Sequence, residues 1–337
     1  MSVFTKNQFS HCAVRFFFAY MSPFTSTVKE KFQRLLFWIQ FVHIYPLYYT
    51  HDHLKGGPFM GEKSLFYRYR FYALGVGALT LIALILRSLS LLLAFDANIG
   101  YFTTDLPIGR FLIYFLYIME ALGIVGCCCL PFLTRKGELP QRHACVSLTG
   151  RVAAGISALL FAAVAIYLLT QIKLLPCPAM LTSLAAICAG VAAAYFALQC
   201  LAAPSTSPAL GYGVILAAAL LLSITYFDRY TQMNAPHKIG LHVCLLSIMV
   251  VALYEIRALI NRAAPRALGV TSALCFFLCA TVGVSDLIAF LAGVYSSTLY
   301  LMIDLLVTGF AFYIACRTGT DLQALTPATG ESKQNNT

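Results

Sequence analysis

The sequence predicts an all-α integral membrane protein, built as a bundle of eight transmembrane helices. Of its 337 residues, 60% are hydrophobic and only 11% are charged, whereas soluble domains carry about 25% charged residues. The apolar runs exceed the roughly 10 residues of a membrane β-strand and approach the roughly 20 residues that a spanning helix needs. Because a lipid-embedded backbone must satisfy its own polar groups, helices are the expected solution.

Each expected helix coincides with one long apolar run. These runs cover residues 73–95, 111–133, 152–172, 179–203, 210–227, 239–259, 267–293 and 298–316. The third, fourth and fifth runs are rich in alanine and glycine, which lets helix backbones approach closely in lipid. We therefore expect these three helices to form a tightly packed core. The pair Gly75 and Gly77 is too little for nucleotide binding, and we interpret it as a helix-packing feature.

The first 59 residues form an atypical N-terminal extension. Residues 35–49 are apolar, but Gln40, His43 and Pro46 interrupt a run that is already short for a span. We expect Met60 to be the natural start, because residues 60–70 provide a short basic lead into the first helix. An interfacial amphipathic segment and a ninth span are the alternatives. The membrane domain then covers residues 60–317, followed by an expected disordered cytoplasmic tail at 318–337.

Basic residues predict the orientation in a cell membrane. From Met60 onward there are 17 lysines and arginines, and with a cytoplasmic N-terminus 12 lie on the inner side and 4 on the outer side. Positive charge favours the cytoplasmic side, so both termini are expected to be cytoplasmic. The net charge of +10 is thereby explained by orientation, and we expect the lipid bilayer rather than nucleic acid as the partner.

Four ionisable side chains lie inside the predicted spans: Arg87, Glu120, Asp286 and Asp304. Such a residue costs about 2.5–3.5 kcal/mol at mid-helix. With a rise of about 1.5 Å per residue, they lie roughly 24, 20, 30 and 25 Å from the cytoplasmic edge. One guanidinium and three acids at similar depths predict a shared polar site in the outer half of the bilayer.

Two main interpretations of this polar site stay open, beside a third in which it contacts lipid headgroups. In the first, the planar fork of Arg87 binds Glu120 or Asp304, and the ion pair locks helices together. In the second, the site binds a small polar ligand or a cation, because three acids outnumber one base and the unpaired acid would be protonated in the low dielectric. An Arg87→Ala variant should collapse under the first interpretation and stay folded but inactive under the second.

The segment 227–238 is the most polar one on the predicted outer side. It contains Asp228 and Asn234, which we add to the candidate ligand- or ion-site residues. The segment is either a lid over the polar site or a solvated connector in which Asn-Ala-Pro forms a turn.

Other chemistry finds no support in the motifs. There is no H-E-x-x-H, P-loop or G-x-S-x-G sequence, so we expect no cofactor, and a membrane-embedded enzyme is only the third interpretation, after a transporter-like and a structural protein. His237 and His242 lack a third ligand at metal spacing, and we expect no metal site. Most of the 12 cysteines lie in apolar runs, where we interpret them as small apolar residues; palmitoylation of Cys127, Cys128 and Cys129 is the alternative.

Two strings carry a resemblance to known sequences. They are residues 86–102, which include Arg87 and Phe95-Asp96-Ala97-Asn98-Ile99-Gly100-Tyr101-Phe102, and residues 233–238, Met233-Asn234-Ala235-Pro236-His237-Lys238. With these strings the chain resembles a group of uncharacterised multi-pass membrane proteins from clostridia-like bacteria, over about residues 60–316. Those proteins begin where Met60 stands, and they have no assigned activity that the resemblance could imply.

The sequence therefore favours a transporter-like or ligand-binding membrane protein that uses the outer-half polar site. The alternative is a structural or sensory membrane partner without transport activity.

Overall fold

The computed structural model confirms the all-α fold class. It describes residues 58–96, 100–103, 107–134, 147–175, 177–201, 207–228, 231–232, 235–260, 262, 264–294 and 296–324. Within these ranges, eight helices are long and apolar enough to cross a membrane. The described chain is thus a multi-pass membrane protein.

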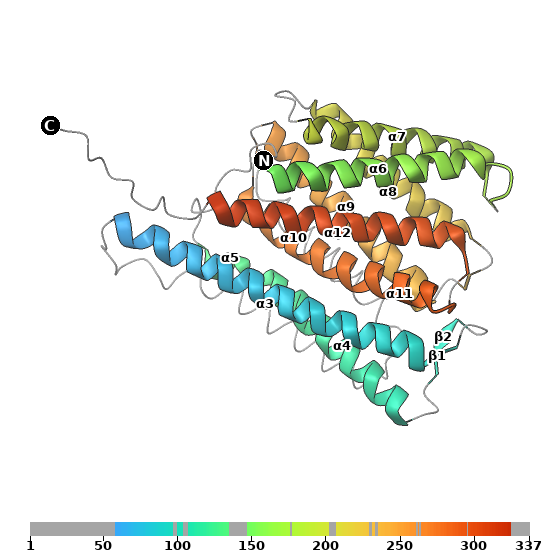
Figure 1. Cartoon of the computed structure of the whole chain (residues 1–337), viewed down its shortest axis with the longest axis horizontal. Helices are drawn as coiled ribbons and strands as arrows, with labels where there is room; N and C mark the ends of the chain where they lie inside the picture. Colours follow the sequence, from blue (N-terminus) through green and yellow to red (C-terminus); the bar gives the residue numbers. More distant parts are fainter. Residues whose placement is uncertain are drawn as a thin grey trace, which may run out of the picture. The chain divides into compact units, whose positions relative to one another are not determined.

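Helices make up nearly all of the described chain (Figure 1). The elements are α3 (Pro58–Leu93), β1 (Phe95–Asp96), β2 (Tyr101–Phe102), α4 (Pro107–Cys128), α5 (Leu130–Leu133), α6 (Leu148–Thr170), α7 (Ala179–Cys200), α8 (Pro208–Phe227), α9 (Pro236–Leu259), α10 (Pro265–Cys279), the π-helix η2 (Ala280–Val284), α11 (Ser285–Leu291) and α12 (Thr298–Ala324). The strands β1 and β2 pair antiparallel directly after α3. The helices α10, η2 and α11 follow one another without a break and form one span, Pro265–Leu291.

The helix boundaries differ from the sequence prediction mainly at prolines. The helices α4, α8, α9 and α10 each begin at a proline, two to four residues before the predicted start. Proline is favoured in the first helical turn, because its missing N–H has no intrahelical partner there. The first helix starts at Pro58, so the predicted basic lead is helical, and the last helix continues to Ala324, into the predicted tail. The remaining residues of the extension and the tail lie outside the described ranges.

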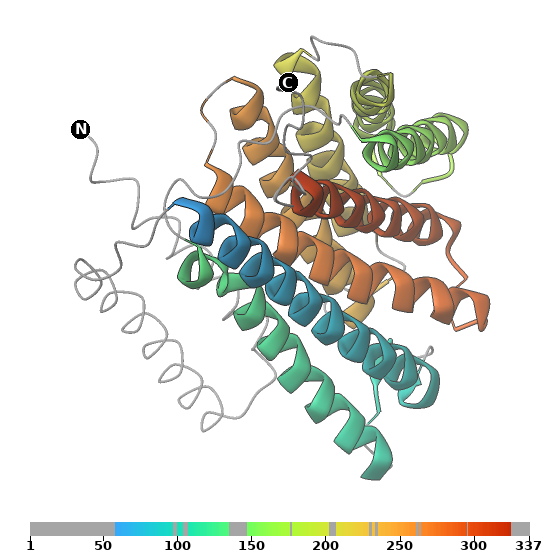
Figure 2. The same ribbon diagram turned by 60° about the vertical axis from the view of Figure 1, so that its left-hand side comes forward.

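The spans form two packing groups (Figures 1 and 2). In the first group α6 packs on α7, α7 on α8 and α8 on α9; α10 packs on both α9 and α12, and α12 also packs on α6. The second group is the pair of α3 and α4, which contacts the first group through α10, η2 and α11. We call these the six-helix group and the α3–α4 pair.

Small residues pack between α6, α7 and α8, as the sequence predicts for these three helices. Alanines of α6, α7 and α8 are almost fully buried, among them Ala153, Ala189 and Ala217. A Cβ atom on Gly213 of α8 would lie 2.6 Å from Val191 Cγ1 of α7, so these two backbones approach too closely for any larger residue. Because Gly213 has no side chain, the two helices can approach closely and form the dispersion contacts that hold helices together in lipid, where apolar burial no longer drives association.

The packing interpretation of Gly75 and Gly77 is wrong. In the part of the chain that the structure describes, a Cβ atom on either residue would have no heavy atom within 4 Å. The close approach lies instead on α4, where a Cβ on Gly123 would be 2.1 Å from Cζ of Phe277 on α10. The Phe277 ring of α10 is 1% exposed and packs directly against Gly123 of α4. This contact joins the α3–α4 pair to the six-helix group.

We expect Gly123→Ala to weaken this contact. The new methyl group overlaps the Phe277 ring, so α4 must shift, at a cost of about 1–3 kcal/mol in the free energy of unfolding. Equilibrium unfolding in detergent micelles measures this loss. The matched control is Gly77→Ala, which meets no neighbour among the described residues and should be neutral or slightly stabilising, since alanine is the better helix former. Equal stability of the two variants would contradict the packing.

Candidate functional site

Arg87 is buried where the α3–α4 pair meets the six-helix group. Its two terminal nitrogens face different acids: Nη1 lies 3.5 Å from Glu120 Oε1 of α4, and Nη2 lies 3.7 Å from Asp286 Oδ1 of α11. The Arg87 side chain is 2% exposed, that of Asp286 0% and that of Glu120 17%. The two terminal nitrogens of the guanidinium thus face two different carboxylates, and Arg87 bridges the two helix groups.

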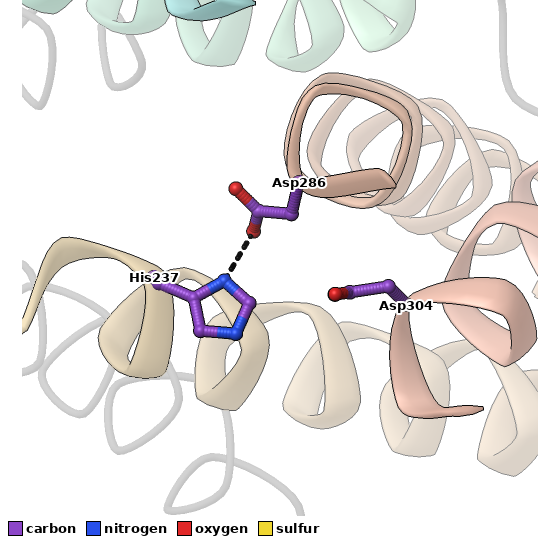
Figure 3. Close-up of side chains that lie close together, drawn as sticks. All are labelled: His237, Asp286 and Asp304. Carbon is purple, nitrogen blue, oxygen red and sulfur yellow. Dashed lines mark ion pairs between the residues drawn. The ribbon is translucent and has the colours of Figure 1, made fainter. Parts of the chain in front are cut away.

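Asp286 also faces a histidine and a third acid (Figure 3). His237 Nδ1 of α9 lies 2.9 Å from Asp286 Oδ2. Asp304 of α12 points toward the imidazole of His237 from the right in Figure 3, next to Asp286. One ligand-type atom from each of His237, Asp286 and Asp304 lies within 4.8 Å of the other two. We call these three residues, together with Arg87 and Glu120, the charge cluster.

Local backbone geometry brings Asp286 and Asp304 together. The π-helix η2 ends at Val284, directly before Ser285. A π-helical turn contains one more residue than an α-helical turn, so the residues that follow it lie on a different face of the helix. Ser285 and Asp286 are both 0% exposed as a result. A Cβ on Gly283 would lie 2.6 Å from Thr308 Oγ1, so η2 and α12 are almost in backbone contact there. Asp286 and Asp304 each lie about one turn away from this contact.

A second glycine makes room for the guanidinium. A Cβ on Gly240 of α9 would lie 3.0 Å from Arg87 Nη2 and 3.0 Å from Val282 Cγ1. Gly240 is three residues from His237, so both are on one face of α9. The absent side chain therefore lets α9 approach Arg87 closely enough for His237 to reach Asp286.

Acidic groups outnumber basic ones in the charge cluster. Three carboxylates and one guanidinium leave a formal charge of −2 when the imidazole is neutral. Asp304 is 2% exposed, and its Oδ1 atom has no hydrogen-bond partner among the described residues. A buried carboxylate oxygen without a partner is costly. A proton or a cation is the chemical species that this space is suited to bind.

Asp228 lies outside the charge cluster but is linked to it. The Tyr300 hydroxyl donates to Asp228 Oδ2 at 2.9 Å, and the Tyr300 ring packs edge-on against His237, with 4.8 Å between ring centroids. Lys238, which is 0% exposed, donates to the backbone oxygens of Asp228 and Thr231 at 2.9 and 3.3 Å. Asp228 and Lys238 are therefore anchored, which argues against a solvated connector. Asn234 lies outside the described residues.

A second buried polar group occurs near the opposite ends of α7, α9 and α12. Arg317 Nη1 donates to Glu255 Oε1 at 2.7 Å, and the Tyr313 hydroxyl donates to Gln199 Oε1 at 3.0 Å. All four residues are at most 9% exposed. We call them the Glu255–Arg317 cluster, and none of the four was predicted as a site residue.

Sequence reasoning found four of the five members of the charge cluster and missed His237. The helix was predicted to start at residue 239, which leaves His237 in a loop. The sequence near His237 also contains no third metal ligand at the usual spacing. The available signal was Pro236, a favourable first helical residue. With that start, His237 belongs to the first turn of α9, next to the buried acids of neighbouring helices.

The fold and this site define the class of protein: a multi-pass α-helical membrane protein with a buried, predominantly acidic charge cluster between two helix groups. Comparisons with protein-family models, with curated proteins and with solved structures found no match to this chain.

Proposed function

We propose that this chain is a transport protein of the cell membrane that carries a cation through the charge cluster. In this proposal both termini are cytoplasmic, which follows from the distribution of basic residues, and the charge cluster lies in the outer half of the bilayer. The resemblance to the clostridial group stays part of the proposal, and two cluster residues, Arg87 and His237, lie in the strings that carry it.

The position of the charge cluster between the two helix groups is the observation that carries the proposal. Arg87 and Glu120 come from the α3–α4 pair, whereas His237, Asp286 and Asp304 come from the six-helix group. In many transporters one helix group moves against another around a buried site. A movement of the α3–α4 pair would separate Arg87 from Asp286 and change access to the carboxylates.

The excess of acids supports a cation as the solute. Ionisable groups within a membrane commonly mark ion pathways or proton relays. Glu120 is the most exposed member of the charge cluster, and Asp304 has the unpartnered oxygen. These two carboxylates are therefore the best candidates for exchanging protons or ions during transport.

The alternative function is structural. Arg87 contacts acids of both helix groups, so the charge cluster could serve only to hold the α3–α4 pair in place. A structural or sensory membrane partner needs only this packing role of the charge cluster and no ion transport.

Flux measurements separate the two functions. The full chain is reconstituted in vesicles, and the entry of protons, Mn²⁺ or Zn²⁺ is followed with trapped fluorescent indicators under an imposed membrane potential. We expect flux well above that of protein-free vesicles, and a loss of at least about tenfold in Glu120→Gln and in Asp304→Asn, because amides cannot take up a proton or neutralise a cation.

The matched control is Asp96→Asn, in the β1 strand outside the charge cluster, which should keep wild-type flux. Monodisperse elution in detergent verifies folding of each variant. Absence of flux in the wild type, or unchanged flux in both cluster variants, would favour the structural alternative.

A further inference from the structure

We propose that His237, Asp286 and Asp304 form a binding site for one divalent first-row transition-metal ion, such as Zn²⁺ or Mn²⁺. The inference deepens the proposed function, on which it rests for the role of the site, by naming the class of cation. Each ligand comes from a different helix, α9, α11 and α12 respectively, and all three side chains converge on one space (Figure 3).

The distances suit a site that closes around an ion. Metal–ligand bonds of about 2.1 Å place neighbouring ligand atoms about 3.0–3.4 Å apart. The ligand atoms here lie within 4.8 Å of one another, and His237 Nδ1 and Asp286 Oδ2 are already 2.9 Å apart. Binding of an ion would require the ligand atoms that lie farther apart, within the 4.8 Å limit, to come closer together.

Charge favours a divalent ion. Two positive charges neutralise the formal charge of −2 that the three carboxylates and Arg87 leave on the charge cluster. The ion also gives a partner to Asp304 Oδ1, which is buried without a hydrogen bond in the described chain. Arg87 faces Asp286 through Oδ1 and His237 faces it through Oδ2, so Arg87 can orient the Asp286 carboxylate while the other oxygen binds the ion.

The ligand set selects among metal ions. One imidazole nitrogen with two carboxylate oxygens suits Mn²⁺, Fe²⁺, Co²⁺ and Zn²⁺. Ca²⁺ prefers six to eight oxygen ligands and Mg²⁺ keeps an octahedral shell of oxygens, so the histidine disfavours both. The coordinating nitrogen must offer a lone pair, and a proton on that nitrogen leaves to water when the ion binds.

Equilibrium binding to the full chain in detergent tests the site. After treatment with a chelator, the protein is titrated with Zn²⁺ by calorimetry and with Co²⁺ by visible absorption, which reports coordination by nitrogen and oxygen. We expect one ion per chain, displacement of Co²⁺ by Zn²⁺, and no comparable binding of Ca²⁺. Because outer ligands alone contribute about 10- to 100-fold in affinity, Asp304→Asn and His237→Gln should each weaken binding by at least about 100-fold.

The matched control is His242→Gln. His242 is on the same helix but contacts Thr225 at 3.0 Å, so its loss should leave the affinity unchanged. If the wild type binds no Zn²⁺ or Co²⁺, or if His237→Gln and Asp304→Asn bind as tightly as the wild type, the inference is wrong. Proton flux without metal binding would overturn the metal site and leave the proposed function standing. Metal binding without flux of any tested ion would overturn the proposed transport function and leave the metal site standing.

Discussion

We expect Arg87→Ala to lower the free energy of unfolding by about 3–5 kcal/mol, the cost of removing one partner from a buried ion pair. Arg87 provides the guanidinium between Glu120 and Asp286, and its side chain is 2% exposed. Its loss leaves buried Asp286 and half-buried Glu120 without their cation. This cost arises whether the charge cluster carries an ion or only joins the helix groups, so a loss of stability in Arg87→Ala does not by itself separate the two interpretations of the polar site. Unfolding in mixed micelles, followed by far-ultraviolet circular dichroism, measures the change.

Two further variants test the cause of this loss. Arg87→Lys keeps the positive charge but replaces a two-pronged fork with one ammonium group, so we expect it to fall between the wild type and Arg87→Ala. The double variant Arg87→Met/Glu120→Gln removes one charge of each sign and should recover part of the stability. If Arg87→Ala unfolds like the wild type, the guanidinium does not hold the two helix groups together.

The helices could be predicted from the sequence because apolar length is a sum over about 20 residues and tolerates local error. The ends of the helices could not be predicted as well, because a proline by itself does not show whether a helix begins or ends there. Pro208, Pro236 and Pro265 each begin a helix, although proline ends helices at other positions. The depth of Arg87 and the acids followed from counting residues, which is why their common level could be predicted.

The contacts within the charge cluster depend on features that hydropathy does not contain. The π-helix η2 changes the face on which Asp286 lies, and Gly240 and Gly283 set how closely α9, α3, η2 and α12 approach. Gly240 and Gly283 are each three residues from a cluster member, His237 and Asp286. A glycine one turn from a buried ionisable residue is therefore a signal that could have pointed to His237.

The basic residues that predict the orientation also have a local role. Arg68 donates to the backbone oxygen of Leu133 at 2.9 Å, Arg151 donates to that of Cys200 at 3.0 Å, and Arg266 donates to that of Thr134. These carbonyls lie at helix C-termini, where a cation compensates the helix dipole and satisfies unpaired oxygens. The same arginines can thus favour the cytoplasmic side and join neighbouring helices there.

The Glu255–Arg317 cluster leads to a second large expected effect. Arg317→Ala should lower the free energy of unfolding by about 3–5 kcal/mol, because it leaves Glu255 as a buried charge without its cation. Arg317 and Glu255 are 9% and 4% exposed, and their ion pair measures 2.7 Å. The pair joins α9 to α12, and Tyr313 extends the connection to Gln199 of α7.

A double-mutant cycle shows how much of this effect belongs to the pair. Glu255→Gln removes the negative charge but keeps the shape, and combining it with Arg317→Met leaves no buried charge. We expect the double variant to be more stable than the sum of the single losses predicts, with a coupling energy of about 0.5–3 kcal/mol. Additive losses would show that the ion pair contributes no coupling. Arg257→Met is the matched control, since Arg257 lies in the same turn of α9 but stacks on Tyr254, so it should change stability much less.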